Sequence, residues 1–299
     1  MGMAAGRPAR LAVGVVSAGR VGAVLGAALA AAGHHVVATS GVSRESVKRA
    51  DALLPGVPLA APDQVVTGAD LALLAVPDDV LPGLVRGLAA AGCFRPGQIV
   101  VHTSGAHGVG VLAPAAEEGV LPLALHPVLT FTGRSEDVVR LGGACVGVTA
   151  TEGDEAGWSV GEALVVEMGA EPVRVPEDVR PLYHAALAHG ANHLVTLVRD
   201  CADLLDRAGV RPAERLIAPL LSAALDNALR HGDRALTGPV ARGDAGTVAV
   251  HLRELDAVDP DLARTYRVLA ARTAHRAQAA GLLPDHAAQE VLRTLTEDQ

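Results

Sequence analysis

The sequence predicts an α/β protein in which a doubly wound parallel sheet is followed by a second, all-helical domain. Two observations support this fold class. Up to residue 176, short apolar runs alternate with helical segments of about a dozen residues, a pattern typical of parallel strands joined by helices. Beyond that point the pattern is almost entirely helical. We therefore expect one domain over residues 1–178 and a second over residues 179–299.

The individual elements follow from the same patterns. Apolar runs predict strands at residues 11–16, 34–40, 70–77, 98–104, 121–131, 145–150 and 171–175. Helical spacing of apolar residues predicts helices at 20–32, 43–54, 78–92 and 155–168. Gly33 is placed to end the first helix. In the helical part, loops are expected at 208–212, 237–244 and 281–285.

Composition limits the class of protein. Half of the residues are hydrophobic but only 2% are aromatic, so the core must be built from Ala, Val and Leu. A net charge of −8 argues against a nucleic-acid partner. The three cysteines are far apart, so we expect neither disulfides nor a metal site. With no apolar run long enough to cross a bilayer and no signal-like leader, we expect a cytoplasmic protein without a membrane partner.

The first strand, turn and helix carry a nucleotide-binding pattern. The turn is formed by Ser17, Ala18, Gly19, Arg20, Val21 and Gly22, which is G-x-G-x-x-G with serine in place of the first glycine. Gly19 and Gly22 meet the need for a bare backbone at the pyrophosphate and for close helix–strand packing. This pattern predicts a Rossmann domain, and the alternative is an ordinary glycine-rich turn. If the turn requires a positive φ at Ser17, cofactor affinity should suffer.

The end of the second strand indicates which dinucleotide binds. An NAD site would place Asp or Glu there, whereas this chain has Ser40, Ser43 and Arg44. Hydroxyls and a guanidinium suit the 2′-phosphate of NADP(H). The alternative is that Ser43 caps the next helix and Arg44 is solvated.

Two later strands end in turns that belong to the same edge of the sheet. The first carries Ala75, Val76 and Pro77, and the second carries Thr103 and Ser104. Because ligands bind at the carboxyl ends of strands in open α/β sheets, we expect all five residues to line the cofactor site. The alternative for Thr103 and Ser104 is a helix cap.

Segments spread over most of the chain carry a family resemblance: SAGRVG, LLAVPDD, VVHTSG, LPLALHPVLTF, LYHAALAHGANHLVTL and LTGPVARGDAGTV. On these the chain resembles bacterial Rossmann-like proteins whose C-terminal domain has no assigned function. They are related to the pyrroline-5-carboxylate reductase, ketopantoate reductase and 6-phosphogluconate dehydrogenase superfamily. The resemblance implies reduction of a C=O or C=N group by a reduced nicotinamide, and a homodimer formed through the helical domain.

Some candidate catalytic residues follow from their chemistry and position, and others from the family resemblance. His126 closes an apolar strand and could donate a proton to a developing alkoxide, or simply bind a loop carbonyl. The resemblance implies a catalytic Lys followed four residues later by Asn on the first long C-terminal helix. Asn192 matches that Asn, but Ala188 stands at the Lys position. His184, two turns before Asn192, could replace the missing proton donor.

Substrate-binding candidates lie in the glycine-containing loop at 237–244. Arg242 could clamp a substrate carboxylate, with Asp244 positioning it, or the loop could be a plain helix connection. His189 and His193 have metal-pair spacing, but no third ligand is suggested, so no metal is expected.

Together these residues predict an NADP(H)-dependent oxidoreductase that reduces the C=O of a small carboxylate substrate held between the domains, in the manner of ketopantoate reductase. Two alternatives stay open. One is a regulatory protein that binds NADP(H) without turnover, which serine at position 17 and alanine at position 188 would favour. The other is an imine or deazaflavin-linked reductase on the same fold.

Overall fold

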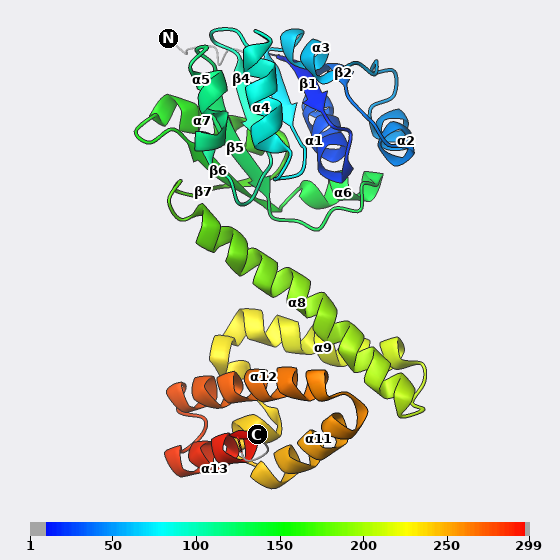
Figure 1. Cartoon of the computed structure of the whole chain (residues 1–299), viewed down its shortest axis with the longest axis vertical. Coiled ribbons are helices and arrows are strands. Elements are labelled where there is room, and N and C mark those ends of the chain that lie inside the picture. Colours follow the sequence, from blue (N-terminus) through cyan, green and yellow to red (C-terminus); the bar gives the residue numbers. More distant parts are fainter. Residues whose placement is uncertain (1–9, 297–299) are drawn as a thin grey trace, which may run out of the picture. The chain divides into compact units, whose positions relative to one another are not determined.

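The computed structural model describes residues 10–296. The chain divides into two compact units, Met1–Gly190 and Ala191–Gln299, and each is considered by itself. Figure 1 shows a sheet covered by helices in the first unit and helices alone in the second, as the sequence predicts. Helix α8 (Arg180–Arg207) contains the division. The division thus falls at residue 190, whereas the sequence pattern placed it at 178, because the first turns of this helix pack on the sheet unit.

The sheet of the first unit has seven strands in the order β2-β1-β3-β4-β5-β6-β7. Their bounds are β1 Ala12–Val16, β2 His35–Thr39, β3 Leu71–Leu74, β4 Ile99–His102, β5 Leu121–Pro127, β6 Cys145–Ala150 and β7 Glu171–Arg174. Strands β1 to β5 are parallel, with β2 and β3 on opposite sides of β1. The order therefore reverses at β1, which is where ligands bind in doubly wound sheets.

One reversal of direction departs from the expected parallel sheet. Strand β6 runs antiparallel to β5, and β7 follows β6 in parallel. In the register, Ala150 at the end of β6 lies opposite Leu123, near the start of β5. The carboxyl ends of β6 and β7 therefore point toward the amino ends of the other strands.

Helices cover both faces of the sheet (Figure 1). The helices of this unit are α1 Arg20–Ala31, α2 Arg44–Leu53, α3 Pro62–Thr67, α4 Leu81–Ala90, α5 Ala113–Ala116 with the 3₁₀ turn Val109–Leu112, α6 Ser135–Leu141 and α7 Glu155–Glu167. Strand β3 explains the two faces. Leu71 and Leu73 belong to one core with residues of α1 and α7, whereas Ala72 and Leu74 belong to another with residues of α3 and α4. All four side chains are buried, as expected for a central parallel strand.

The predicted helices at 20–32, 43–54, 78–92 and 155–168 are confirmed, with slightly shorter bounds. Helices α3 and α6 were not expected from the pattern. Each spans fewer than two turns, and a helical period cannot be read over so short a segment.

The second unit contains helices only, apart from its connections. They are the later part of α8, α9 Ala213–His231, the 3₁₀ turn Gly232–Ala235, α10 Gly238–Arg242, α11 Ala245–Val258, α12 Pro260–Ala279 and α13 Asp285–Thr296. The segment 237–244, expected to be a loop, holds the one-turn helix α10, with Pro239 in its first turn. Within residues 10–296, every helix is too short or too polar to cross a membrane.

Candidate functional site

The turn between β1 and α1 is held by the end of β2. The amide of Ser17 donates to Ser40 Oγ at 2.8 Å, and the amide of Ala18 donates to the Ser40 carbonyl oxygen at 2.7 Å. Ser17 has a φ of 78°, the left-handed region in which a side chain is disfavoured. The positive φ considered for Ser17 is therefore present. A serine here stores strain that glycine would not.

Two glycines leave the backbone of this turn bare. A Cβ on Gly22 would lie 2.1 Å from the Ser17 carbonyl oxygen and 2.8 Å from Ala75 Cβ, so no side chain fits there. Gly19 is the N-cap of α1 and makes no side-chain capping bond, and the first turn of the helix contains no acidic residue. The amide groups at this helix end are thus left for an anion, which the helix dipole also favours.

Basic side chains flank the same helix end. Arg20 is the first residue of α1 and is exposed. Arg49 reaches back from α2, and its Nε donates to the Ala18 carbonyl oxygen at 3.3 Å. Arg49 was not expected from the sequence, because no motif marks a side chain of the second helix that contacts the turn before the first helix. Both guanidinium groups suit a phosphate neighbour.

The three residues expected at the end of β2 have different environments. Ser40 is buried, and its hydroxyl accepts from Ser17 as described above. Ser43 caps α2 by accepting from the Ser46 amide at 3.0 Å, which is the capping alternative considered for it. Arg44 begins α2 and is exposed. Of the three side chains, that of Arg44 is the one that a 2′-phosphate could reach without displacing a structural bond.

The carboxyl ends of β3 and β4 lie at the same edge of the sheet as the turn after β1. Ala75 and Val76 follow β3 and are partly exposed, and Pro77 is exposed. After β4, Thr103 is partly buried, and Ser104 Oγ accepts from the His107 amide at 3.0 Å. Ser104 therefore caps a tight turn rather than a helix.

His102, at the end of β4, is fully buried. Its Nδ1 accepts from the Ser104 amide, and its Nε2 lies 2.9 Å from the Gly108 carbonyl oxygen, where it must donate. Burial lowers the pKa of His102 to about 4. The ring is consequently neutral at pH 7 and has a fixed tautomer, which makes it a structural part of the edge.

His126 and His184 meet beside Gly105, although they are far apart in sequence. Their ring centroids are 5.9 Å apart, with planes at 86°. A Cβ on Gly105 would lie 2.8 Å from His126 Nε2 and 2.6 Å from His184 Cδ2. The structure therefore brings together the two histidines that the sequence analysis chose separately, at the carboxyl end of β5.

Two neighbours of this pair were missed by the sequence analysis. The Tyr183 hydroxyl lies 2.8 Å from His126 Nδ1. Arg180 is fully buried and donates to Thr149 Oγ1 and to the Ser104 carbonyl oxygen, both at 2.6 Å. Burial, with Arg180 and His184 acting in the same direction, lowers the pKa of His126 to about 4. A signal was available, because Tyr183 stands directly before His184 in the segment that carries the resemblance.

The remaining expected residues belong to the second unit. Asn192 and Arg242 are exposed. Asp244 caps α11 by accepting from the Thr247 amide at 3.0 Å and from the Thr247 hydroxyl at 2.7 Å. The roles in substrate binding expected for these three residues stay predictions.

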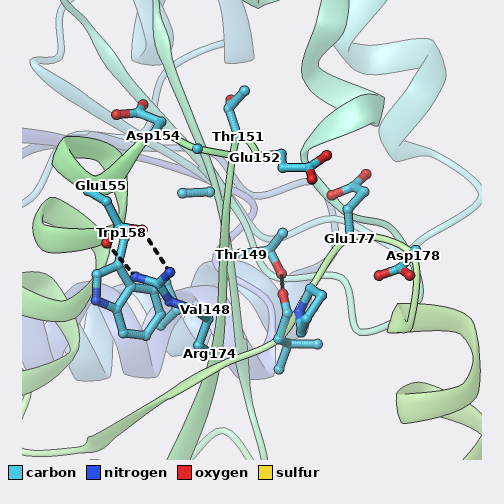
Figure 2. A pocket seen from close by; sticks show the side chains of 14 residues that line it. Val148, Thr149, Thr151, Glu152, Asp154, Glu155, Trp158, Arg174, Glu177 and Asp178 are labelled. Carbon is cyan, nitrogen blue, oxygen red and sulfur yellow. Dashed lines mark hydrogen bonds and ion pairs between the residues drawn. The ribbon is translucent and has the colours of Figure 1, made fainter.

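A cavity of about 530 Å³ lies elsewhere in the first unit, around the carboxyl ends of β6 and β7. Figure 2 shows Trp158 beside Arg174, which Glu155 also binds, with Glu177 and Asp178 on the opposite wall. Its lining residues all fall within 148–178. The lining includes no residue of the glycine-rich turn, but Thr149 in it accepts from Arg180, the buried neighbour of the histidine pair.

Fold and site together define a class of protein: a Rossmann-type sheet with an open helix N-terminus, followed by a helical unit. Comparison of the sequence with family models agrees. Residues 3–127 match the Rossmann-like domain, and residues 145–273 match a domain of unknown function, DUF2520. The expected Rossmann-like domain followed by a helical region of unassigned function is confirmed. No curated protein sequence matches the chain.

Solved structures resemble the whole chain at low sequence identity. A protein from Bacteroides fragilis described as a candidate NADP oxidoreductase has a TM-score of 0.74 at 19% identity, covering 88% of this chain and 98% of its own. A protein from Thermotoga maritima has a TM-score of 0.65 at 18% identity, with 90% and 99% covered. An imine reductase variant from Myxococcus stipitatus in complex with NAD⁺ has a TM-score of 0.57 at 16% identity, with 97% and 100% covered. These likenesses confirm the fold.

Proposed function

We propose that the chain is an NADP(H)-dependent oxidoreductase that reduces the C=O group of a small carboxylate substrate, with ketopantoate-like keto acids as the leading class. The observation that supports the proposal most directly is the N-terminus of α1, where Gly19 is the N-cap, Gly22 lies in the first turn and no side chain caps the helix. The names of two structural relatives, an NADP oxidoreductase candidate and an imine reductase with NAD⁺, support the same class of reaction.

The residues at the turn fit a dinucleotide. Gly22 packs directly against the turn, so that a Cβ there would clash with the Ser17 carbonyl oxygen. The uncapped amides at the start of α1 would hold the pyrophosphate. Arg20 and Arg49 add positive charge there, and Arg44 would meet the 2′-phosphate. The reduced nicotinamide would supply a hydride to the substrate carbon. On this proposal the protein's part is to hold the carbonyl group and to protonate its oxygen.

His126 is the group that we propose to face the substrate oxygen, with His184 as its neighbour. With the pyrophosphate at β1 and the adenosine ribose at β2, the nicotinamide half would extend over β3 and β4. Gly105, directly after β4, has both histidine rings against it. Asn192, Arg242 and Asp244 are proposed to orient the substrate, on the strength of the resemblance for Asn192 and of their chemistry for the others.

The first experiment is a titration with NADPH and NADH, followed by nicotinamide fluorescence. We expect NADPH to bind more tightly. Arg44→Ala should weaken NADPH binding roughly tenfold and leave NADH binding unchanged, since it removes one charge-assisted contact. Arg86→Ala, an exposed arginine on α4, is the matched control. Binding of neither dinucleotide would overturn the proposal, whereas tight binding followed by turnover of keto acids would support it.

A second candidate function is a regulatory protein that binds NADP(H) without turnover. The positive φ of Ser17 favours it, because strain in the turn is tolerable in a sensor, and so does Ala188 at the position where the resemblance implies a lysine. Tight NADPH binding without oxidation of the cofactor by keto acids or cyclic imines would support this candidate. Turnover with cyclic imines alone would instead support an imine reductase.

We also propose that the partner of the chain is a second copy of itself. Leucines of α9 are largely exposed in the single chain, with exposed fractions of 68% for Leu220 and 80% for Leu229. On α8, Val195 is 63% exposed. Leu216 and Leu225 of α9 are exposed as well, and several exposed apolar side chains along one helix are typical of an interface. Light scattering should give a dimer mass, and Leu220→Glu with Leu229→Glu should give a monomer.

A further inference from the structure

The Tyr183 hydroxyl and His126 Nδ1 form a hydrogen bond at the end of β5. The hydroxyl oxygen lies 2.8 Å from His126 Nδ1, and the two rings meet edge to face at 85°. Among the described residues, His126 Nδ1 is the acceptor that this hydroxyl reaches. We infer the direction from this lack of another acceptor: the tyrosine donates and the imidazole Nδ1 accepts.

The imidazole is neutral, so it carries a single proton. Burial lowers the pKa of His126 to about 4, and Arg180 and His184 contribute in the same direction. With Nδ1 accepting from Tyr183, that proton must be on Nε2. Nε2 is also the ring atom next to Gly105, on the side of the carboxyl ends of the strands. The donor atom thus faces the edge where the carbonyl oxygen of a substrate would lie.

Arg180 holds a positive charge beside the tyrosine. Its guanidinium carbon is 5.9 Å from the centre of the Tyr183 ring. Bonds to Thr149 and to the Ser104 carbonyl oxygen fix it, and its Nε has no partner among the described residues. Burial raises the pKa of Tyr183, and the positive charge of Arg180 acts in the opposite direction by favouring the phenolate.

We propose that Tyr183 is a positioning residue, held beside Arg180, which fixes His126 as the Nε2–H tautomer and resupplies its proton through Nδ1. The inference rests on the proposed function. Bound reduced nicotinamide would supply the hydride to the substrate carbon and be left oxidised, and His126 Nε2 would give its proton to the substrate oxygen. The Tyr183 proton passes to His126 Nδ1. The phenolate that remains is stabilised by Arg180 and regains a proton from water, so one carbonyl group becomes one alcohol.

The test uses the full-length chain with and without NADPH. Long-range ¹⁵N–¹H spectra of cofactor-free protein report the tautomer of each histidine, and His126→Gln assigns the signal. We expect a pure Nε2–H tautomer in the wild type and a mixture of both tautomers in Tyr183→Phe. In turnover, Tyr183→Phe should lower kcat roughly 10- to 100-fold, with little change in KM.

The chain supplies its own control. Its other tyrosine, Tyr266, lies 2.9 Å from His251 Nδ1 in the second unit, so Tyr266→Phe removes the same kind of bond elsewhere. We expect it to leave the His126 signal and kcat unchanged. An Nδ1–H tautomer in the wild type, or an unchanged His126 signal in Tyr183→Phe, would overturn the inference. Failure of the wild type to bind NADPH would overturn the proposed function, and the spectra would still decide the role of Tyr183.

Discussion

The Ser17 amide donates to Ser40 Oγ at 2.8 Å while Ser17 itself has a φ of 78°. The end of β2 therefore holds a strained residue at the start of the nucleotide turn. A hydrogen bond between two short polar residues, 23 positions apart, secures the conformation that glycine would adopt freely. The substitution in the fingerprint is thus accommodated by a partner on the adjacent strand.

Ser17→Gly should relieve this strain. We expect the free energy of unfolding to rise by about 1 kcal/mol, because glycine adopts positive φ without penalty. NADPH should bind at least as tightly as in the wild type. Urea denaturation and a fluorescence titration measure the two effects. Ser17→Ala keeps the Cβ and serves as the control, and a glycine variant no more stable than this alanine variant would contradict the interpretation.

Gly105→Ala should disturb the two histidines. The added Cβ would approach His126 Nε2 and His184 Cδ2 to less than 3 Å, so at least one ring must move. We expect a loss of stability of about 1–3 kcal/mol, as for other overpacked sites, together with a loss of turnover. Gly83→Ala is the matched control, since nothing lies within 4 Å of its Cβ and alanine favours the helix. Equal stability and activity of the two variants would show that the rings are not packed as described.

Stability should fall in mild acid because of His102. Its pKa of about 4 in the folded state lies below the ordinary value of 6.5, so the unfolded chain binds the proton more strongly. The stabilisation is fully present above pH 6.5 and is lost as the pH falls toward 4. Its size is on the order of 3 kcal/mol. Denaturation curves between pH 4 and 7 measure it.

The control for the denaturation curves between pH 4 and 7 is an exposed histidine. His102→Gln should give a flatter pH dependence than the wild type, and His35→Gln, at the exposed start of β2, should leave it unchanged. His126, whose pKa is also lowered to about 4, adds to the same slope. A wild-type stability that does not vary over this range would refute the assignment.

Asp244 should act as a helix cap. Asp244→Ala removes the acceptor of the Thr247 amide and should cost about 1 kcal/mol in unfolding free energy. Asp244→Ser keeps a capping side chain and should restore most of that stability. If the serine variant is stable but shows a raised KM, Asp244 binds substrate as well, as the sequence analysis expected.

Local patterns carried most of the fold prediction. The turn from Ser17 to Gly22 and the strands around it were predicted correctly, because a strand, a glycine turn and a helix follow one another directly in the chain. The direction of β6 could not be predicted. An apolar run of six residues looks the same in a parallel and an antiparallel strand. Helix α10 was missed since its glycines and proline are also typical of a loop.

The candidate site was predictable only in part. His126 and His184 were identified from their types and positions, but their contact depends on how α8 begins on the sheet. Tyr183 and His126 are 57 residues apart, and no periodic signal connects them. Arg180 could not be predicted as a site residue, because an arginine is expected at the surface. Its complete burial depends on hydrogen-bond acceptors from two segments that are distant in sequence.

The stacking of Trp158 with Arg174 has a practical consequence. This is the one tryptophan in the chain, so its emission comes entirely from the cavity near β6 and β7. Thr149, which lines this cavity, accepts from Arg180, and Arg180 also donates to the Ser104 carbonyl oxygen just after β4. Because tryptophan emission overlaps the absorption of reduced nicotinamide, binding of NADPH at that edge should quench Trp158 by energy transfer. A compound that changes the tryptophan emission of the cofactor-free protein would instead report binding in or near the cavity.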